Sequence, residues 1–141
     1  ILRPGMVHAE SLAAVCGEIQ RSKFNAQKSV LRSPGLLQKH YSPNARLLVL
    51  CWRDDGDLQS QIRNSQSAIR NCFVIAHTKI PAGEIFPNVS VIPHDAEAFA
   101  RALYAELHRC DDAGAELIVV EAPPDLPEWS GIADRLRRAS A

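Results

Sequence analysis

From Leu47 onward, short apolar runs alternate with stretches of helical periodicity, and this alternation strongly limits the possible folds. Short, mostly apolar runs are typical of strands buried on both faces of a sheet. Strands that alternate with helices favour a mostly parallel sheet with right-handed crossovers. The predicted strands are Leu47–Trp52, Cys72–His77, Val89–Ile92 and Leu117–Val120. The segment from Lys79 to Asn88 is rich in Pro and Gly, and we expect it to be irregular.

Three other segments of this region have apolar residues at helical spacing. Asp57 and Asp95 are placed to cap the first two helices, and Gly114 suits the position after the second. The inner positions are Leu58, Ile62, Ser65 and Ile69, then Phe99, Leu103, Leu107 and Cys110, and finally Trp129, Ile132, Ala133 and Leu136. Together these patterns predict an α/β fold for residues 46–141, a three-layer Rossmann-like domain with a mostly parallel sheet.

The N-terminal third has a different pattern. Residues 9–20 predict one short amphipathic helix, with Leu12, Val15, Cys16 and Ile19 on its apolar face. A lone short helix is marginal in water, so this face needs a partner, and a homodimer is one way to supply it. Residues 21–45 lack periodicity and form a long linker. We therefore divide the chain into residues 1–20, 21–45 and 46–141.

Residues 33–43 do not have the composition of a flexible spacer. The segment reads Ser-Pro-Gly-Leu-Leu-Gln-Lys-His-Tyr-Ser-Pro, and its two prolines restrict the backbone at both ends. Between them stand Lys39, His40 and Tyr41, which are residue types that bind phosphates and bases. Arg3, before the Pro4-Gly5 turn, is also suited to grip a phosphate. We expect this strap to lie on a ligand or another domain.

Composition excludes several classes of function. The 141 residues hold 16 basic and 16 acidic side chains, so net charge gives no support for a general nucleic-acid or membrane binder. No apolar run approaches the roughly 20 residues that span a bilayer. The four cysteines are widely spaced and predict reduced, mostly buried thiols in a cytoplasmic protein rather than a zinc site. Cys51 and Cys72 fall in predicted strands and should be unreactive.

The acidic turn after the first predicted strand is the main candidate site in the α/β region. It reads Trp-Arg-Asp-Asp-Gly-Asp and lacks the glycine pattern of dinucleotide-binding turns. Asp54 and Asp55 suggest an alternative function, a free-standing receiver-like binding module that uses magnesium. That alternative needs a further Asp and a Lys after later strands. Asp95 is better placed as a helix cap, and no lysine follows Val120.

Other candidates for chemistry in this region are weak. His77, His94 and His108 have no serine or cysteine in a nucleophile-elbow context, and His108 is expected to be exposed. Arg135, Arg137 and Arg138 are more typical of a solvated helix face than of an RNA contact, although that alternative stays open. From the residues alone, we identify no active site in residues 46–141.

Several segments resemble the Sua5 form of the threonylcarbamoyl-AMP synthase family. They are Ile1–Gly5, the strap Ser33–Pro43, and in the C-terminal part Phe99–Tyr104, Ile118–Glu121 and Asp134–Ala139. They occur in the family's order and cover nearly the whole chain. The sequence departs from the family at Leu36–Lys39, where members tend to have Met-Lys-Tyr-Arg, and this weakens the case for Lys39. A second departure is Glu128–Gly131.

The resemblance implies a nucleotidyltransferase as the parent protein. Family members make threonylcarbamoyl-AMP and pyrophosphate from L-threonine, bicarbonate and ATP, with magnesium, and the product supplies the t6A37 modification of tRNA. Residues 1–20 would be the end of a YrdC-like catalytic domain, and the rest of that domain would be missing here. The chain alone is expected to be inactive, to hold no cofactor or metal, and to meet tRNA only indirectly.

The resemblance also assigns roles to Arg3, near the end of the catalytic domain, and to residues of the linker. Arg3 matches an ATP-contacting arginine, and Tyr41 in His-Tyr-x-Pro matches the linker position that reaches the nucleotide. Lys39 and His40 are weaker candidates for the same ligand. The linker would cover the catalytic cleft, where exclusion of water protects an easily hydrolysed adenylate.

Overall fold

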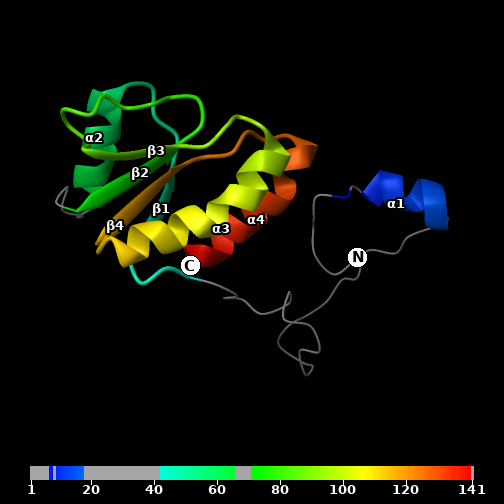
Figure 1. Cartoon of the computed structure of the whole chain (residues 1–141). Coiled ribbons are helices and arrows are strands. Elements are labelled where there is room, and N and C mark those ends of the chain that lie inside the picture. Colours follow the sequence, from blue (N-terminus) through cyan, green and yellow to red (C-terminus); the bar gives the residue numbers. More distant parts are fainter. Residues whose placement is uncertain (1–6, 8, 18–41, 66–70, 141) are drawn as a thin grey trace. The chain divides into compact units, whose positions relative to one another are not determined.

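One four-stranded parallel sheet organises residues 42–122. The computed structural model describes residues 7, 9–17, 42–65 and 71–140. The strands stand in the order β1-β4-β2-β3, and all three neighbouring pairs are parallel (Figure 1). Their bounds are Arg46–Leu50 for β1, Cys72–Ala76 for β2, Asn88–Val91 for β3 and Leu117–Glu121 for β4. The predicted parallel, Rossmann-like α/β fold is confirmed.

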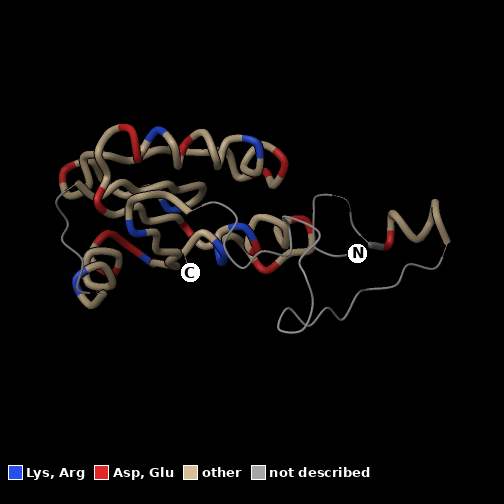
Figure 2. Tube along the Cα trace, turned by 90° about the horizontal axis from the view of Figure 1, so that it is seen from below, with Lys and Arg blue, Asp and Glu red and all other residues tan. Residues whose placement is uncertain are grey.

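Two helices cover opposite faces of this sheet. Helix α2, Asp55–Asn64, joins β1 to β2, and helix α3, Ala96–Asp112, joins β3 to β4. The two connections cross the sheet in opposite directions. Right-handed crossovers of opposite direction place their helices on opposite faces. Figures 1 and 2 show this arrangement, with the sheet between α2 and α3.

The core has an apolar layer on each side of the sheet. Leu58 and Ile62 of α2 are fully buried, and each such side chain contributes about 1.5–3 kcal/mol relative to full exposure. On the other side, the core face of α3 matches its predicted pattern. The layer that contains the α2 residues also holds Trp52, Cys72, Val74, Ala76, Phe86, Leu117 and Val119. The buried residues of α3 are Ala96, Phe99, Leu103, Leu107 and Cys110.

The sheet is buried at its centre and partly open at its edges. All five residues of β2 and of β4 are buried. Strand β1 is an edge strand, and its residues after Leu47 are only half-buried. The prediction that the first strand is buried on both faces was therefore wrong, because β1 has a strand neighbour on one side only, β4.

The helix ends show one wrong and two correct predictions. The N-cap of α2 is Asp54, whose carboxylate accepts from the backbone N–H of Asp57 at 2.8 Å. Asp57, predicted as the cap, lies within the first turn and accepts at 3.0 Å from the backbone N–H of Arg53. Asp95 caps α3 as predicted, and Gly114 follows α3 with a φ of 78°. A positive φ explains why glycine stands there.

The connection from β2 to β3, residues 77–87, contains no helix, as predicted. Side chains from neighbouring elements fix it instead. The backbone N–H of Ala82 donates to Asp55 at 2.9 Å, and the indole N–H of Trp52 donates to the carbonyl of Lys79 at 3.1 Å. Phe86 is 1% exposed and anchors the end of the loop in the core. The loop therefore has a defined path beside the carboxyl ends of β1 and β2.

Residues 9–17 and 123–139 belong to a second unit. Helix α1 spans Ala9–Cys16, η2 spans Pro127–Trp129 and α4 spans Ser130–Ala139. In α1, Val15 of the predicted apolar face is 86% exposed, so the need of this face for a partner stays a prediction. In the terminal helix, Ala133 is exposed, against prediction. Trp129, Ile132 and Leu136 are buried as predicted. None of the helices among the described residues is both long and apolar enough to cross a membrane.

Candidate functional site

The residues expected to bind the nucleotide come from residues 1–20 and from the linker. Arg3, Lys39, His40 and Tyr41 all lie outside the described residues. Their proposed contacts with ATP therefore stay predictions. The site that the structure does describe lies at the carboxyl ends of the parallel strands, where ligands of open α/β sheets usually bind.

The acidic turn after β1 is used to fix the backbone. Asp54 caps α2, Asp57 accepts from the N–H of Arg53, and Asp55 holds the loop through Ala82. The pKa of Asp57 is lowered, first by the hydrogen bond from the Arg53 backbone N–H and then by the one from the Gln61 side-chain amide. Among the described residues, no group of three or more His, Cys, Asp or Glu side chains is placed to hold a metal ion. The magnesium-binding, receiver-like alternative has no support in this geometry.

Glu121 forms the most extensive polar network of the strand ends. It is the last residue of β4 and is only 5% exposed. Its Oε2 accepts from the backbone N–H groups of His77 at 2.8 Å and Thr78 at 2.9 Å. The N–H of Lys79 and the hydroxyl of Thr78 also donate to the carboxylate. Three successive N–H groups that converge on one anion resemble a backbone anion site, here filled by the protein's own carboxylate.

Two opposing effects act on the pKa of Glu121. Burial alone would raise it, because a charged carboxylate loses its hydration. The hydrogen bonds from the Thr78 hydroxyl and from the N–H groups of Thr78, His77 and Lys79 lower it, and they prevail. The pKa of Glu121 therefore lies below its ordinary value, so the buried group carries a negative charge at neutral pH.

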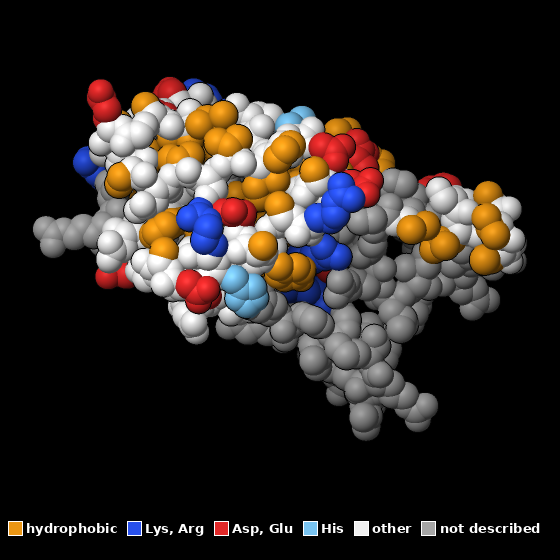
Figure 3. All heavy atoms as spheres, viewed as in Figure 1, with side chains coloured by type: hydrophobic (Ala, Val, Ile, Leu, Met, Phe, Trp, Pro, Cys, Tyr) orange, Lys and Arg blue, Asp and Glu red, His pale blue; other side chains and the backbone are white. Residues whose placement is uncertain are grey.

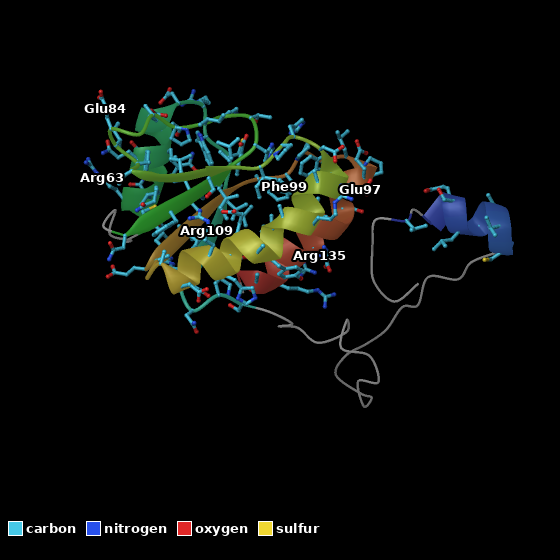
Figure 4. The ribbon with its side chains drawn as sticks, viewed as in Figure 1. Arg63, Glu84, Glu97, Phe99, Arg109 and Arg135 are labelled. Carbon is cyan, nitrogen blue, oxygen red and sulfur yellow. The ribbon has the colours of Figure 1, made fainter. Side chains whose placement is uncertain are left out.

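Next to this carboxylate, two histidines that were considered separately in the sequence form a pair. The Nδ1 atoms of His77 and His94 are 2.8 Å apart, and the rings stack with centroids 4.9 Å apart. Phe99, near the start of α3 (Figure 4), meets the His77 ring edge to face at 5.5 Å. A useful signal was available, since His77 and His94 follow the ends of β2 and β3, which the parallel sheet brings together.

Charged side chains elsewhere are mostly neutralised locally. On the exposed face of α3, Arg101 pairs with Glu97, and basic side chains there have acidic ones beside them (Figure 3). In α4, Arg137 and Arg138 lie 2.7 Å and 3.0 Å from Asp134. A shared carboxylate reduces the positive charge that this helix can offer to RNA.

The thiols divide into two groups. Cys72 and Cys110 are buried, and loss of hydration raises the pKa of each to about 11. Such thiols are unreactive, as predicted for Cys72. Cys16 and Cys51 are exposed. The prediction that Cys51 is buried in a strand was wrong, because β1 ends one residue earlier, at Leu50.

A pocket of about 400 Å³ lies over the proline-rich segment before α4. Residues 123–127 line it together with Ser130 and Ala133. Asp125 is its one ionisable side chain. General acid–base or nucleophilic chemistry needs a second positioned group, so this lining does not define a catalytic centre.

The fold and the strand-end network define a small, open, parallel α/β domain. A sequence model described as the C-terminal domain of threonylcarbamoyl-AMP synthase matches residues 7–141. The chain belongs to this family, as the C-terminal part of a Sua5-type protein. The family resemblance found in the sequence is thereby confirmed, and the receiver-like alternative is set aside.

Individual relatives agree with this assignment. Threonylcarbamoyl-AMP synthase of Pyrococcus abyssi is 28% identical over 99% of this chain and 42% of its own length. The Bacillus subtilis enzyme is 31% identical over 99% of this chain and 41% of its own. The crystal structure of P. abyssi Sua5 complexed with L-threonine matches with a TM-score of 0.72 and 27% identity, over 99% of this chain and 41% of that one. The chain thus spans about two-fifths of the length of these relatives.

Proposed function

We propose that this chain is the linker and accessory region of a threonylcarbamoyl-AMP synthase. The parent enzyme would convert L-threonine, bicarbonate and ATP, with magnesium, to threonylcarbamoyl-AMP and pyrophosphate, in the cytoplasm. The product would serve the t6A37 modification of tRNA, which the enzyme itself would meet only indirectly. One observation carries this proposal: the family match covers residues 7–141, while the relatives extend well beyond the matched part.

The proposed division of labour follows the sequence. Residues 1–20 are the end of the catalytic domain, residues 21–45 are a lid, and residues 46–141 are the accessory domain. In this proposal Arg3 and Tyr41 contact ATP, and Lys39 and His40 contribute less. The described strand ends support an accessory role, because the carboxylates of Asp54, Asp55 and Glu121 already accept hydrogen bonds from backbone N–H groups.

A chimaeric enzyme tests the proposal. The part of the B. subtilis relative that lies outside the match is joined to this chain before Ile1, and pyrophosphate release is measured with ATP, L-threonine and bicarbonate. We expect turnover by the chimaera and none by the 141-residue chain alone. Turnover by the chain alone at a rate comparable to the chimaera would refute the accessory role.

Point variants of the chimaera test the proposed ATP contacts of Arg3 and of the lid. Arg3→Ala and Tyr41→Ala should each raise the KM for ATP by about tenfold, the effect of losing one charge-assisted or stacking contact. Lys39→Ala and His40→Ala should have smaller effects. Arg63→Ala, on the exposed side of α2, is the matched control and should leave KM unchanged. If the KM for ATP is the same in the Tyr41 variant and in this control, the proposal that the lid contacts ATP is wrong.

A further inference from the structure

The His77–His94 pair connects the end of β2 to the start of α3, and β3 lies between these two elements in the chain. His77 follows β2 and is 8% exposed, whereas His94 is exposed and precedes Asp95, the N-cap of α3. The ring contact therefore ties the end of a central strand to the start of the longest helix. In the same turn, the backbone N–H of Ile92 donates to the carbonyl of Ala76 in β2 at 3.0 Å.

The hydrogen-bond partners determine where the protons of the neutral pair reside. The Nε2 atom of His77 lies 3.3 Å from the carbonyl oxygen of Ala122, which only accepts. Nε2 of His77 therefore carries a proton, and in the neutral ring Nδ1 is then an acceptor. His94 must donate to it from its own Nδ1. The pair holds one proton between two nitrogens that are 2.8 Å apart.

Successive protons have opposite effects on this contact. The first can bind at Nε2 of His94, which leaves the Nδ1–H donor in place and makes the hydrogen bond charge-assisted. The second must bind at Nδ1 of His77. Two N–H groups then face each other, neither nitrogen can accept, and two cationic rings are stacked. The doubly protonated pair must separate.

The charged groups around the pair include one buried anion. Glu121 of β4 lies beneath it, with Oε2 4.0 Å from Nδ1 of His77. From the loop after β2, Lys79 contributes an exposed ammonium group, and its N–H bonds to Glu121. From the turn into α3, the Asp95 carboxylate is occupied by the N–H of Ala98. Phe99 of α3 is neutral. One buried anion can balance one imidazolium but not two.

We propose that His77 and His94 form a proton-operated latch between the carboxyl end of β2 and the start of α3. The latch is closed while the pair holds none or one extra proton, and it opens on binding the second. When the latch opens, the turn at Ile92–Asp95 loses its side-chain contact with the end of β2. This inference does not depend on the proposed enzymatic role of the parent protein.

Long-range ¹H–¹⁵N NMR of the histidine rings tests the latch on the whole chain between about pH 8 and pH 4, the range in which imidazoles gain protons. At the upper end we expect His77 protonated at Nε2 and His94 at Nδ1. On acidification, the two rings should titrate in coupled steps. At the second step, the protection of the Ile92 backbone N–H should fall about tenfold, the loss expected for one hydrogen bond.

Two variants and a control make the result decisive. In His94→Asn, the side-chain amide places its polar atoms where Nδ1 stood and can donate or accept, so the drop in Ile92 protection should disappear. In His94→Ala the contact is absent, and protection should be low at every pH. His108→Ala, which alters an exposed histidine on α3, should behave like the parent chain. Independent titration of His77 and His94, or an unchanged pH profile in His94→Asn, would overturn the latch.

Discussion

The Oε2 atom of Glu121 lies 2.8 Å from the backbone nitrogen of His77, so the last residue of β4 holds the residue that follows β2. Thr78 and Lys79 donate to the same carboxylate. Glu121→Ala leaves these N–H groups without their acceptor and should lower the free energy of unfolding by about 3 kcal/mol, measured by urea denaturation. Glu121→Gln keeps one acceptor oxygen and should cost about half as much.

The control for this prediction is Glu97→Ala. Glu97 accepts from Arg101 at 2.9 Å in an exposed ion pair, with 69% of its side chain accessible. Exposed pairs contribute little, so this variant should change the free energy by less than about 1 kcal/mol. If Glu121→Ala is no more destabilising than Glu97→Ala, the network is not what holds the loop.

The same carboxylate gives the domain a predictable acid response. The hydrogen bonds lower the folded-state pKa of Glu121 from its ordinary value of 4.5. A lowered pKa means that the unfolded chain binds the proton more readily, so the stabilisation is complete above about pH 4.5 and is lost as pH falls toward the folded-state pKa. The stability difference between the parent chain and Glu121→Gln should therefore shrink below about pH 4. A difference that stays constant from about pH 7 to pH 3 would contradict this assignment.

The fold could be predicted from the sequence because strand and helix patterns are local. Buried β2 and β4, the core face of α3 and the caps at Asp95 and Gly114 all follow from periodicity and cap chemistry. The edge position of β1 could not, since the order of strands depends on long-range pairing.

The strand-end network was missed for a related reason. Glu121, His77 and His94 stand far apart in the sequence and become neighbours only through the registers of β2 with β3 and β4. Considered singly, each lacks a catalytic or ligand-binding context. The choice of Asp57 over Asp54 as the cap of α2 was a smaller error, because three aspartates within four residues satisfy the same cap preference.

Asp54 gives a separate test of the acidic turn. Because its carboxylate accepts the N–H of Asp57 at 2.8 Å, Asp54→Ala should destabilise the chain by about 1 kcal/mol, whereas Asp54→Ser should retain most of the cap. Asp112→Ala is the control, since Asp112 is exposed in the last turn of α3 and opposes the helix dipole there. It should be neutral or slightly stabilising. Equal losses for Asp54→Ser and Asp54→Ala, measured by thermal unfolding, would exclude a capping role.

Gly114 and Gly83 separate backbone strain from steric crowding. A Cβ atom added at either glycine meets nothing within 4 Å, but Gly114 has a φ of 78°. Gly114→Ala should therefore cost about 1–2 kcal/mol from the left-handed backbone alone. Gly83→Ala should be neutral or stabilising by a few tenths of a kcal/mol, since it restricts the unfolded chain. A loss of similar size at both positions would show that the φ of Gly114 is not the cause.

The two groups of cysteines should react at different rates with a thiol-specific disulfide reagent. In the native chain at about pH 8, the exposed Cys16 and Cys51 should be modified quickly. Cys72 and Cys110 should be modified only as fast as the domain opens, because burial withholds them from the reagent and raises the pKa of each to about 11. The absorbance of the released chromophore should then report two fast-reacting thiols in the native chain and four reactive thiols in denaturant. Cys51→Ser should remove half of the fast phase, and Cys72→Ser should leave it intact. A third fast thiol in the native chain would mean that the core of α3 or β2 is accessible to solvent.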